Sequence, residues 1–158
     1  MRATMLAALG LVAALVACAD PDPVPAVTIT AAAPDTLVPA DDYRNDLTIS
    51  VDYADGDGDL GRGRALVHDC RADGLITELA LPAIASDEAV AAGVAISGAL
   101  DLRVNDVGAV APAAAAPAAC AELGVGAPAA GTAIFCVVLI DAAGHAGAGD
   151  CTAPLTVR

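Results

Sequence analysis

The chain has 158 residues, a formal net charge of −13 and no lysine, so all seven of its cationic side chains are arginines. This length suits one domain. The acidic excess disfavours binding to nucleic acid or anionic lipid and favours cations or basic partners, although it also fits a surface that serves only solubility. Much of the hydrophobic content is alanine and only three residues are aromatic, so the core must consist of branched aliphatic side chains.

The N-terminus has the organisation of an export signal. An arginine at position 2 precedes an apolar run from Met5 to Val16, which is shorter than the roughly 20 residues of a transmembrane helix but typical of a signal peptide. The segment Leu15-Val16-Ala17-Cys18 resembles the lipobox of bacterial lipoproteins. This resemblance implies cleavage of residues 1–17, acylation of Cys18 and attachment to a membrane, with Ala19 favouring the outer membrane. An ordinary secretory signal with an incidental cysteine is the alternative.

Residues 18–26 are expected to form a short tether, because prolines at every second position from Pro21 to Pro25 forbid a helix and favour extended geometry. Strands are expected where apolar and polar residues alternate, most clearly at 47–53. Ser86 is expected to cap a helical turn that runs to Ala92. The other expected strands are 27–30, 64–70, 75–81, 94–104, 132–140 and 155–157, and the alanine- and proline-rich stretch 109–130 is expected to be a long loop without helix.

Seven short strands with turn signals and almost no helix predict an all-β protein, an antiparallel β-sandwich over 27–158. Two segments resemble bacterial immunoglobulin-like domains of the cadherin, fibronectin III and PKD kind. One is the strand that runs into Asp55-Gly56-Asp57-Gly58-Asp59, and the other is the apolar strand that ends in Ile140-Asp141-Ala142-Ala143-Gly144. The resemblance implies an immunoglobulin-like sandwich of about seven strands.

Four cysteines remain after acylation of Cys18, and an even number in an exported protein indicates two disulfides. Three pairings are possible. We favour Cys136–Cys151 across the last hairpin, which leaves Cys70–Cys120.

The acidic turn after the 47–53 strand is the sharpest local signal. Asp55, Asp57 and Asp59 alternate along the chain and can direct oxygens at one hard cation such as calcium. The positions at which an EF-hand needs glycine and glutamate hold leucines, which excludes that motif. In immunoglobulin topology the loop after the second strand and the loop before the last strand lie at one pole. We therefore expect Asp141, and with it Asp150, to join a calcium site there.

Other interpretations of these residues remain open. Arg62 could neutralise the carboxylates in place of a cation, or the turn could be solvated, with Asp and Gly serving turn geometry alone. His68 and His145 are the only imidazoles. No Gly-x-Ser-x-Gly elbow accompanies them, and no ligand set of suitable spacing predicts copper or zinc.

We therefore expect a lipid-anchored cell-envelope protein with a non-catalytic binding or scaffolding domain for a protein or glycan ligand of the envelope. Its partners would be the membrane, through the lipid, and not nucleic acid. The alternative is a small extracytoplasmic hydrolase or redox enzyme that uses histidine or cysteine at a loop pole. A third interpretation is an accessory subunit of a larger envelope assembly.

Overall fold

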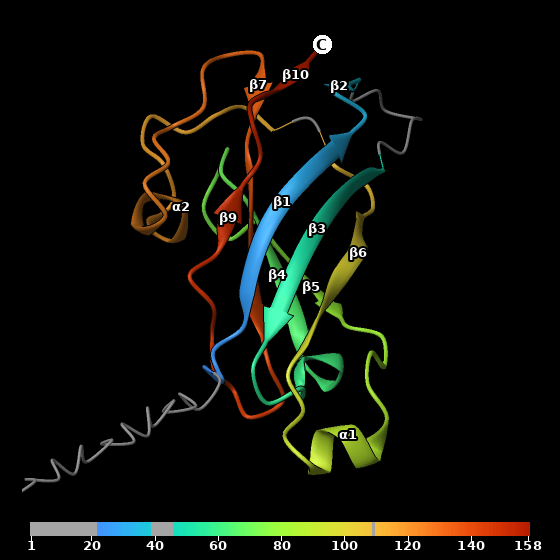
Figure 1. Ribbon diagram of the computed structural model, residues 1–158. Helices are drawn as coiled ribbons and strands as arrows, with labels where there is room; N and C mark the ends of the chain where they lie inside the picture. Colours follow the sequence, from blue (N-terminus) through green and yellow to red (C-terminus); the bar gives the residue numbers. More distant parts are fainter. Residues whose placement is uncertain (1–21, 39–45, 109) are drawn as a thin grey trace, which may run out of the picture.

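The computed structural model describes residues 22–38, 46–108 and 110–158 (Figure 1). The segment expected to be a signal peptide, Cys18 and the first part of the expected tether lie outside the described residues. The described strands are β1 (Ala26–Ala33), β2 (Thr36–Leu37), β3 (Leu47–Asp55), β4 (Arg64–Asp69), β5 (Ile76–Ala80), β6 (Ile96–Val104), β7 (Thr132–Ala133), β8 (Phe135–Ile140), β9 (Asp150–Cys151) and β10 (Leu155–Val157). The helical segments are η1 (Leu60–Arg62), α1 (Asp87–Ala91) and α2 (Ala118–Glu122).

The strands form three sheets. One has the order β1-β3-β6 and another has the order β5-β4-β8-β9, and every pair within these two sheets is antiparallel. The third, small sheet is β2-β10-β7, in which β10 runs parallel to β2 and antiparallel to β7. Figure 1 shows β1, β3 and β6 as one layer, with β4 and β5 behind it. The all-β, largely antiparallel prediction is confirmed.

The core follows directly from the alternation in β3. Leu47, Ile49 and Val51 are fully buried, while the residues between them are more exposed. Phe135, Val137 and Leu139 of β8 belong to the same hydrophobic cluster. Because successive side chains of a strand point to opposite faces, each of the two larger sheets turns one apolar face toward this shared core.

The strand count is larger than the seven that the sequence predicts. The expected strand 132–140 is interrupted at Ile134, because β7 pairs with β10 whereas β8 pairs with β4 and β9. The short strands β2 and β9 have only two residues each, which is too few for an alternation to be visible. The predicted strand 94–104 begins at Ile96 instead, and Val94 is exposed.

The helical turn at 86–92 is found as α1, in which the Ala89 N–H donates to Ser86 Oγ at 3.3 Å. The expectation that 109–130 lacks helix is wrong, because α2 begins directly after Pro117. Proline breaks a helix from its interior but is tolerated at its start. The stretch therefore contains a short helix between its prolines.

A second, smaller cluster lies on the other face of β8. Cys136 alternates with the core-facing residues of that strand, and it is fully buried, as are Cys70 and Cys120. The disulfides are Cys70–Cys120 and Cys136–Cys151, which is the pairing that the sequence favours. Leu123 and Val125, just after Cys120, pack on this cluster. The α2 region is thus held against the sheet by both apolar contacts and a covalent bond.

Candidate cation site

Two core-facing rows of side chains end in an aspartate at the same end of the molecule. In β3 the alternation that buries Val51 and Tyr53 carries on to Asp55, which is 2% exposed. In β8 the alternation that buries Val137 and Leu139 carries on to Asp141, also 2% exposed. The strand period that builds the core therefore also places two carboxylates at its edge, one from each large sheet.

Asp57 and Asp59, in the turn after β3, complete the group. One ligand oxygen from each of Asp55, Asp57, Asp59 and Asp141 lies within 4.8 Å of all the others. The turn needs Gly58, whose φ is +80° and whose added Cβ would lie 2.3 Å from the carbonyl oxygen of Val94. The structure thus brings together the four residues that the sequence predicts as one site.

Backbone donors hold one side of several of these carboxylates. The Leu60 N–H donates to Asp55 Oδ2 at 2.9 Å, and the Ala143 N–H donates to Asp59 Oδ2 at 3.0 Å, which ties the two loops together. The N–H groups of Gly144 and His145 both donate to Asp141 Oδ1, at 2.7 and 2.8 Å. The loops are therefore shaped around the carboxylates.

The remaining oxygens of the turn aspartates have no such donor. Within the described residues, Oδ1 of Asp55, of Asp57 and of Asp59 is buried and has no hydrogen-bond partner. A buried polar atom without a partner costs about 1–3 kcal/mol, and more if it is charged. A cation bound among these three oxygens would satisfy all of them at once.

The pKa values of two of these aspartates also indicate that the carboxylates repel one another. Burial raises the pKa of Asp55, and the neighbouring carboxylates Asp57, Asp59 and Asp141 raise it further, against the lowering effect of the Leu60 N–H. Burial also raises the pKa of Asp59, and Asp141 and Asp57 add to it. Two unit charges 4.8 Å apart repel by about 3 kcal/mol at an effective dielectric constant near 20. Ionisation of Asp55 and Asp59 is therefore disfavoured unless a positive charge lies nearby.

Neither of the other predicted contributors reaches this group. Arg62 forms its ion pair with Asp87 of α1, and both side chains are largely exposed, so the interpretation of Arg62 as the neutralising charge is not supported. Asp150 lies in β9, where its Oδ2 accepts from the Ile29 N–H at 2.7 Å and joins β9 to β1. Asp150 thus serves strand contacts instead.

The donor set fits calcium. Carboxylate oxygens are hard ligands, and calcium takes six to eight of them at 2.3–2.6 Å. The four oxygens all lie within 4.8 Å of one another, which is close enough for one ion to contact all of them. Smaller magnesium demands near-ideal octahedral geometry. Asp55, Asp57, Asp59 and Asp141 would hold the ion, and water or backbone oxygens would complete its shell.

The two histidines lie in different surroundings. His145 Nδ1 is 2.8 Å from Asp141 Oδ2, and this hydrogen bond, with the negative charge of Asp141, raises the pKa of His145. His68 lies in β4 opposite Cys136, and burial lowers its pKa. The hydroxyl of Ser50 donates to Asp101 at 2.6 Å. None of these contacts joins a hydroxyl to an imidazole.

In comparisons with known proteins, no family model, curated protein or solved structure matches the chain. In the described segments, no helix has the length and apolar character needed to cross a membrane.

Proposed function

We propose that the chain is a lipid-anchored cell-envelope protein whose one domain is a calcium-stabilised, immunoglobulin-like β-sandwich for binding or scaffolding. The observation that carries the calcium part is the convergence of four carboxylates with three buried, unpaired oxygens. An acidic group of this kind at the edge of a core is unstable without a cation and stable with one. The ion would fix the two loops of this pole relative to each other.

The strand order supports the immunoglobulin-like part. If β1, β3 and β6 are strands A, B and E, and β5, β4, β8 and β9 are C′, C, F and G, the observed orders A-B-E and C′-C-F-G are those of the immunoglobulin topology. The calcium ligands then lie in the B–C and F–G loops, which share one end of that architecture. Lean aliphatic packing and two disulfides suit a small exported domain.

The short tether would place the four aspartates at the end of the domain that is nearest to the proposed anchor. Asp22 follows Cys18 by four residues, at most about 14 Å of extended chain. Asp22 lines one groove together with Asp55 and Gly56. An acyl chain on Cys18 would therefore hold the domain by its calcium end, which leaves the opposite end free for a protein or glycan ligand.

Thermal unfolding tests the calcium part. The metal-free wild-type protein should melt about 10 °C lower than the same protein in calcium at 100 times its Kd, because such an excess stabilises by about 2.7 kcal/mol. The double variant Asp57→Asn/Asp59→Asn should show no calcium-dependent rise. Magnesium at the same concentration should have a much smaller effect on the wild type. If calcium does not change the melting temperature of the wild type, the four aspartates do not form a calcium site and serve only the conformation of the turn.

Lipid labelling tests the anchor independently. Cells that express the full chain with radiolabelled palmitate should yield a labelled protein in the membrane fraction. Cys18→Ser should abolish both the label and membrane retention, whereas Cys70→Ser should keep the label. Wild-type protein that carries no palmitate label and lies in the soluble fraction would contradict the lipid anchor. The calcium proposal would be unaffected.

A further inference from the structure

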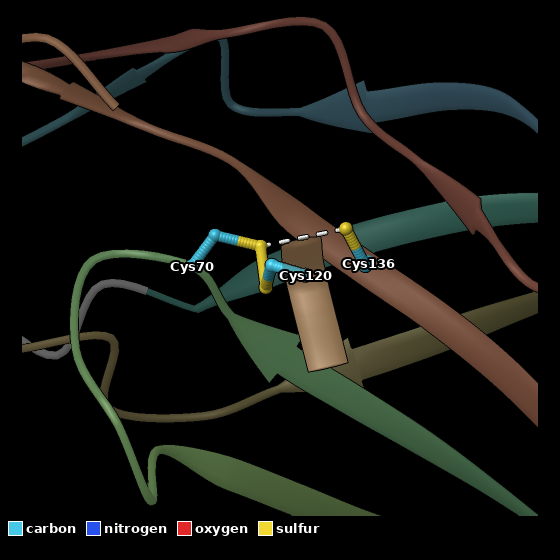
Figure 2. Close-up of side chains that lie close together, drawn as sticks. All are labelled: Cys70, Cys120 and Cys136. Carbon is cyan, nitrogen blue, oxygen red and sulfur yellow. Dashed lines mark hydrogen bonds between the residues drawn. A yellow bond between two sulfur atoms is a disulfide. The ribbon is translucent and has the colours of Figure 1, made fainter. Parts of the chain in front are cut away.

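The two disulfides touch each other. Cys70 Sγ and Cys136 Sγ lie 3.4 Å apart, although each is bonded to a different cysteine. Figure 2 shows Cys136 pointing toward the Cys70–Cys120 pair, with the dashed line marking this contact. Neither sulfur carries a hydrogen in the oxidised protein, so the two sulfurs are in direct van der Waals contact. Four cysteines from distant parts of the chain thus form one continuous sulfur cluster.

Access to this cluster is one-sided. Cys70, Cys120 and Cys136 are 0% exposed, whereas Cys151, in the edge strand β9, is partly exposed. Thiol–disulfide exchange requires a thiolate to reach a disulfide sulfur, so its rate depends on which sulfur is accessible. A thiol from solution can therefore reach the cluster at Cys151 first.

We propose that Cys151 is an entry site for small extracytoplasmic thiols and that Cys136 relays the exchange to the buried disulfide. In the first step the thiolate of the small thiol forms a bond to Cys151 Sγ, the Cys136–Cys151 bond breaks, and Cys136 leaves as a thiolate. In the second step Cys136 Sγ bonds to Cys70 Sγ, the Cys70–Cys120 bond breaks, and Cys120 leaves as a thiolate that takes a proton from water. Two disulfides remain throughout, one of them mixed, so no further oxidant or reductant is needed.

The second step needs little movement. A disulfide has an S–S length near 2.05 Å, so the two sulfurs must approach by about 1.3 Å from their 3.4 Å contact. The backbone segments that carry Cys70 and Cys136 are already held close together, because the Cys70 N–H donates a hydrogen bond to the carbonyl oxygen of Ile134 at 2.9 Å. The new bond would link the end of β4 to β8, which are neighbours in the sheet. The α2 region, by contrast, would lose its covalent link to the sheet.

Peptide mapping after limited exchange tests this relay. The full-length oxidised protein is incubated with glutathione, quenched with an alkylating agent, and cleaved on the carboxyl side of Asp and Glu. Glu122, Asp141 and Asp150 lie between the C-terminal cysteines, so each cysteine falls in its own peptide. The proposal predicts glutathione on Cys151, a disulfide between Cys70 and Cys136, and an alkylated Cys120.

A matched variant separates the relay from direct attack. Cys136→Ser removes the relaying sulfur and leaves Cys70–Cys120 in place, so opening of that bond by glutathione should slow at least tenfold. Alkylated Cys136 beside an intact Cys70–Cys120 in the wild type, or glutathione first on Cys120, would overturn the proposal. The wild-type map decides the question alone if the variant fails to fold.

Discussion

The four aspartates Asp55, Asp57, Asp59 and Asp141, here called the acidic pole, can be compared with the sulfur cluster. Both bring side chains of one kind into contact, but the aspartates repel one another whereas the cysteines are covalently bonded. Each contains four side chains of one kind: three aspartates from one turn with Asp141 from a second loop, and four cysteines that are joined in two disulfides. The cysteines satisfy one another by covalent bonds, and three of the four are fully buried. The aspartates repel one another, and three of their buried oxygens have no partner among the described residues.

The contrast indicates what each region contributes. The sulfur cluster is complete as soon as the chain is oxidised, and it fixes the α2 region to the outer face of a sheet. The four carboxylates repel one another, so we propose that the rigidity of this end of the domain depends on a bound cation. The disulfides therefore stabilise the oxidised protein without any ligand until a small thiol exchanges with them, whereas we expect the acidic group to respond to calcium.

Loss of the long disulfide should have the largest effect. Cys70→Ser/Cys120→Ser opens a link across 50 residues and should lower the free energy of unfolding by about 4 kcal/mol in urea denaturation, whereas Cys136→Ser/Cys151→Ser, across 15 residues, should cost about 3 kcal/mol. Calcium affinity should stay the same in both variants, because the acidic pole is separate. A large loss of calcium affinity would show that the two regions are coupled.

A substitution at Gly63 should disturb the acidic pole indirectly, by displacing the backbone that carries Asp141. An added Cβ would lie 2.0 Å from the carbonyl oxygen of Ile140 and 2.8 Å from Asp141 Cα, so the chain carrying Asp141 must shift. Gly63→Ala should cost about 1–3 kcal/mol of stability and weaken calcium binding about tenfold. Gly126→Ala is the control, since its Cβ would meet nothing within 4 Å. Equal behaviour of the two variants would contradict this role of Gly63.

The pH dependence of stability should give the smallest effect. The folded pKa values of Asp55 and Asp59 are raised from 3.8, so in the metal-free protein they contribute stability that is fully present below that pH and is lost as pH rises through the raised values. The metal-free wild type should therefore gain stability on acidification toward pH 4, relative to Asp55→Asn/Asp59→Asn. Comparison with the variant removes the opposite contribution of His68, whose pKa is lowered. If the free energy of unfolding had the same pH dependence in both proteins, the pKa values of Asp55 and Asp59 would not be raised by folding.

The sequence predicts the parts of this molecule that rest on strand periodicity. The alternation at 47–53 identifies the buried face of β3, and its continuation to Asp55 could have predicted the burial of that carboxylate. The same alternation in β8 could have placed Cys136 on the face opposite the core. Both signals lie in a period of two residues.

Long-range contacts could not be predicted in this way. The pairing of Arg62 with Asp87, the use of Asp150 by the Ile29 N–H, and the contact between the disulfides depend on how loops and edges meet in space. The division of 132–140 between two sheets likewise depends on tertiary pairing. Apolar composition alone makes that stretch resemble one strand.

Calorimetric titration of calcium into the metal-free oxidised protein tests the central claim most directly. We expect one ion per chain with a Kd of about 0.1 to 1 mM, the range of extracellular calcium modules. Asp57→Asn/Asp59→Asn should show no binding, and Asp52→Asn/Asp73→Asn, which removes the same charge at exposed positions, should bind like the wild type. Absence of binding in the wild type at millimolar calcium, or equal loss in both double variants, would contradict the claim that these four aspartates form a calcium site.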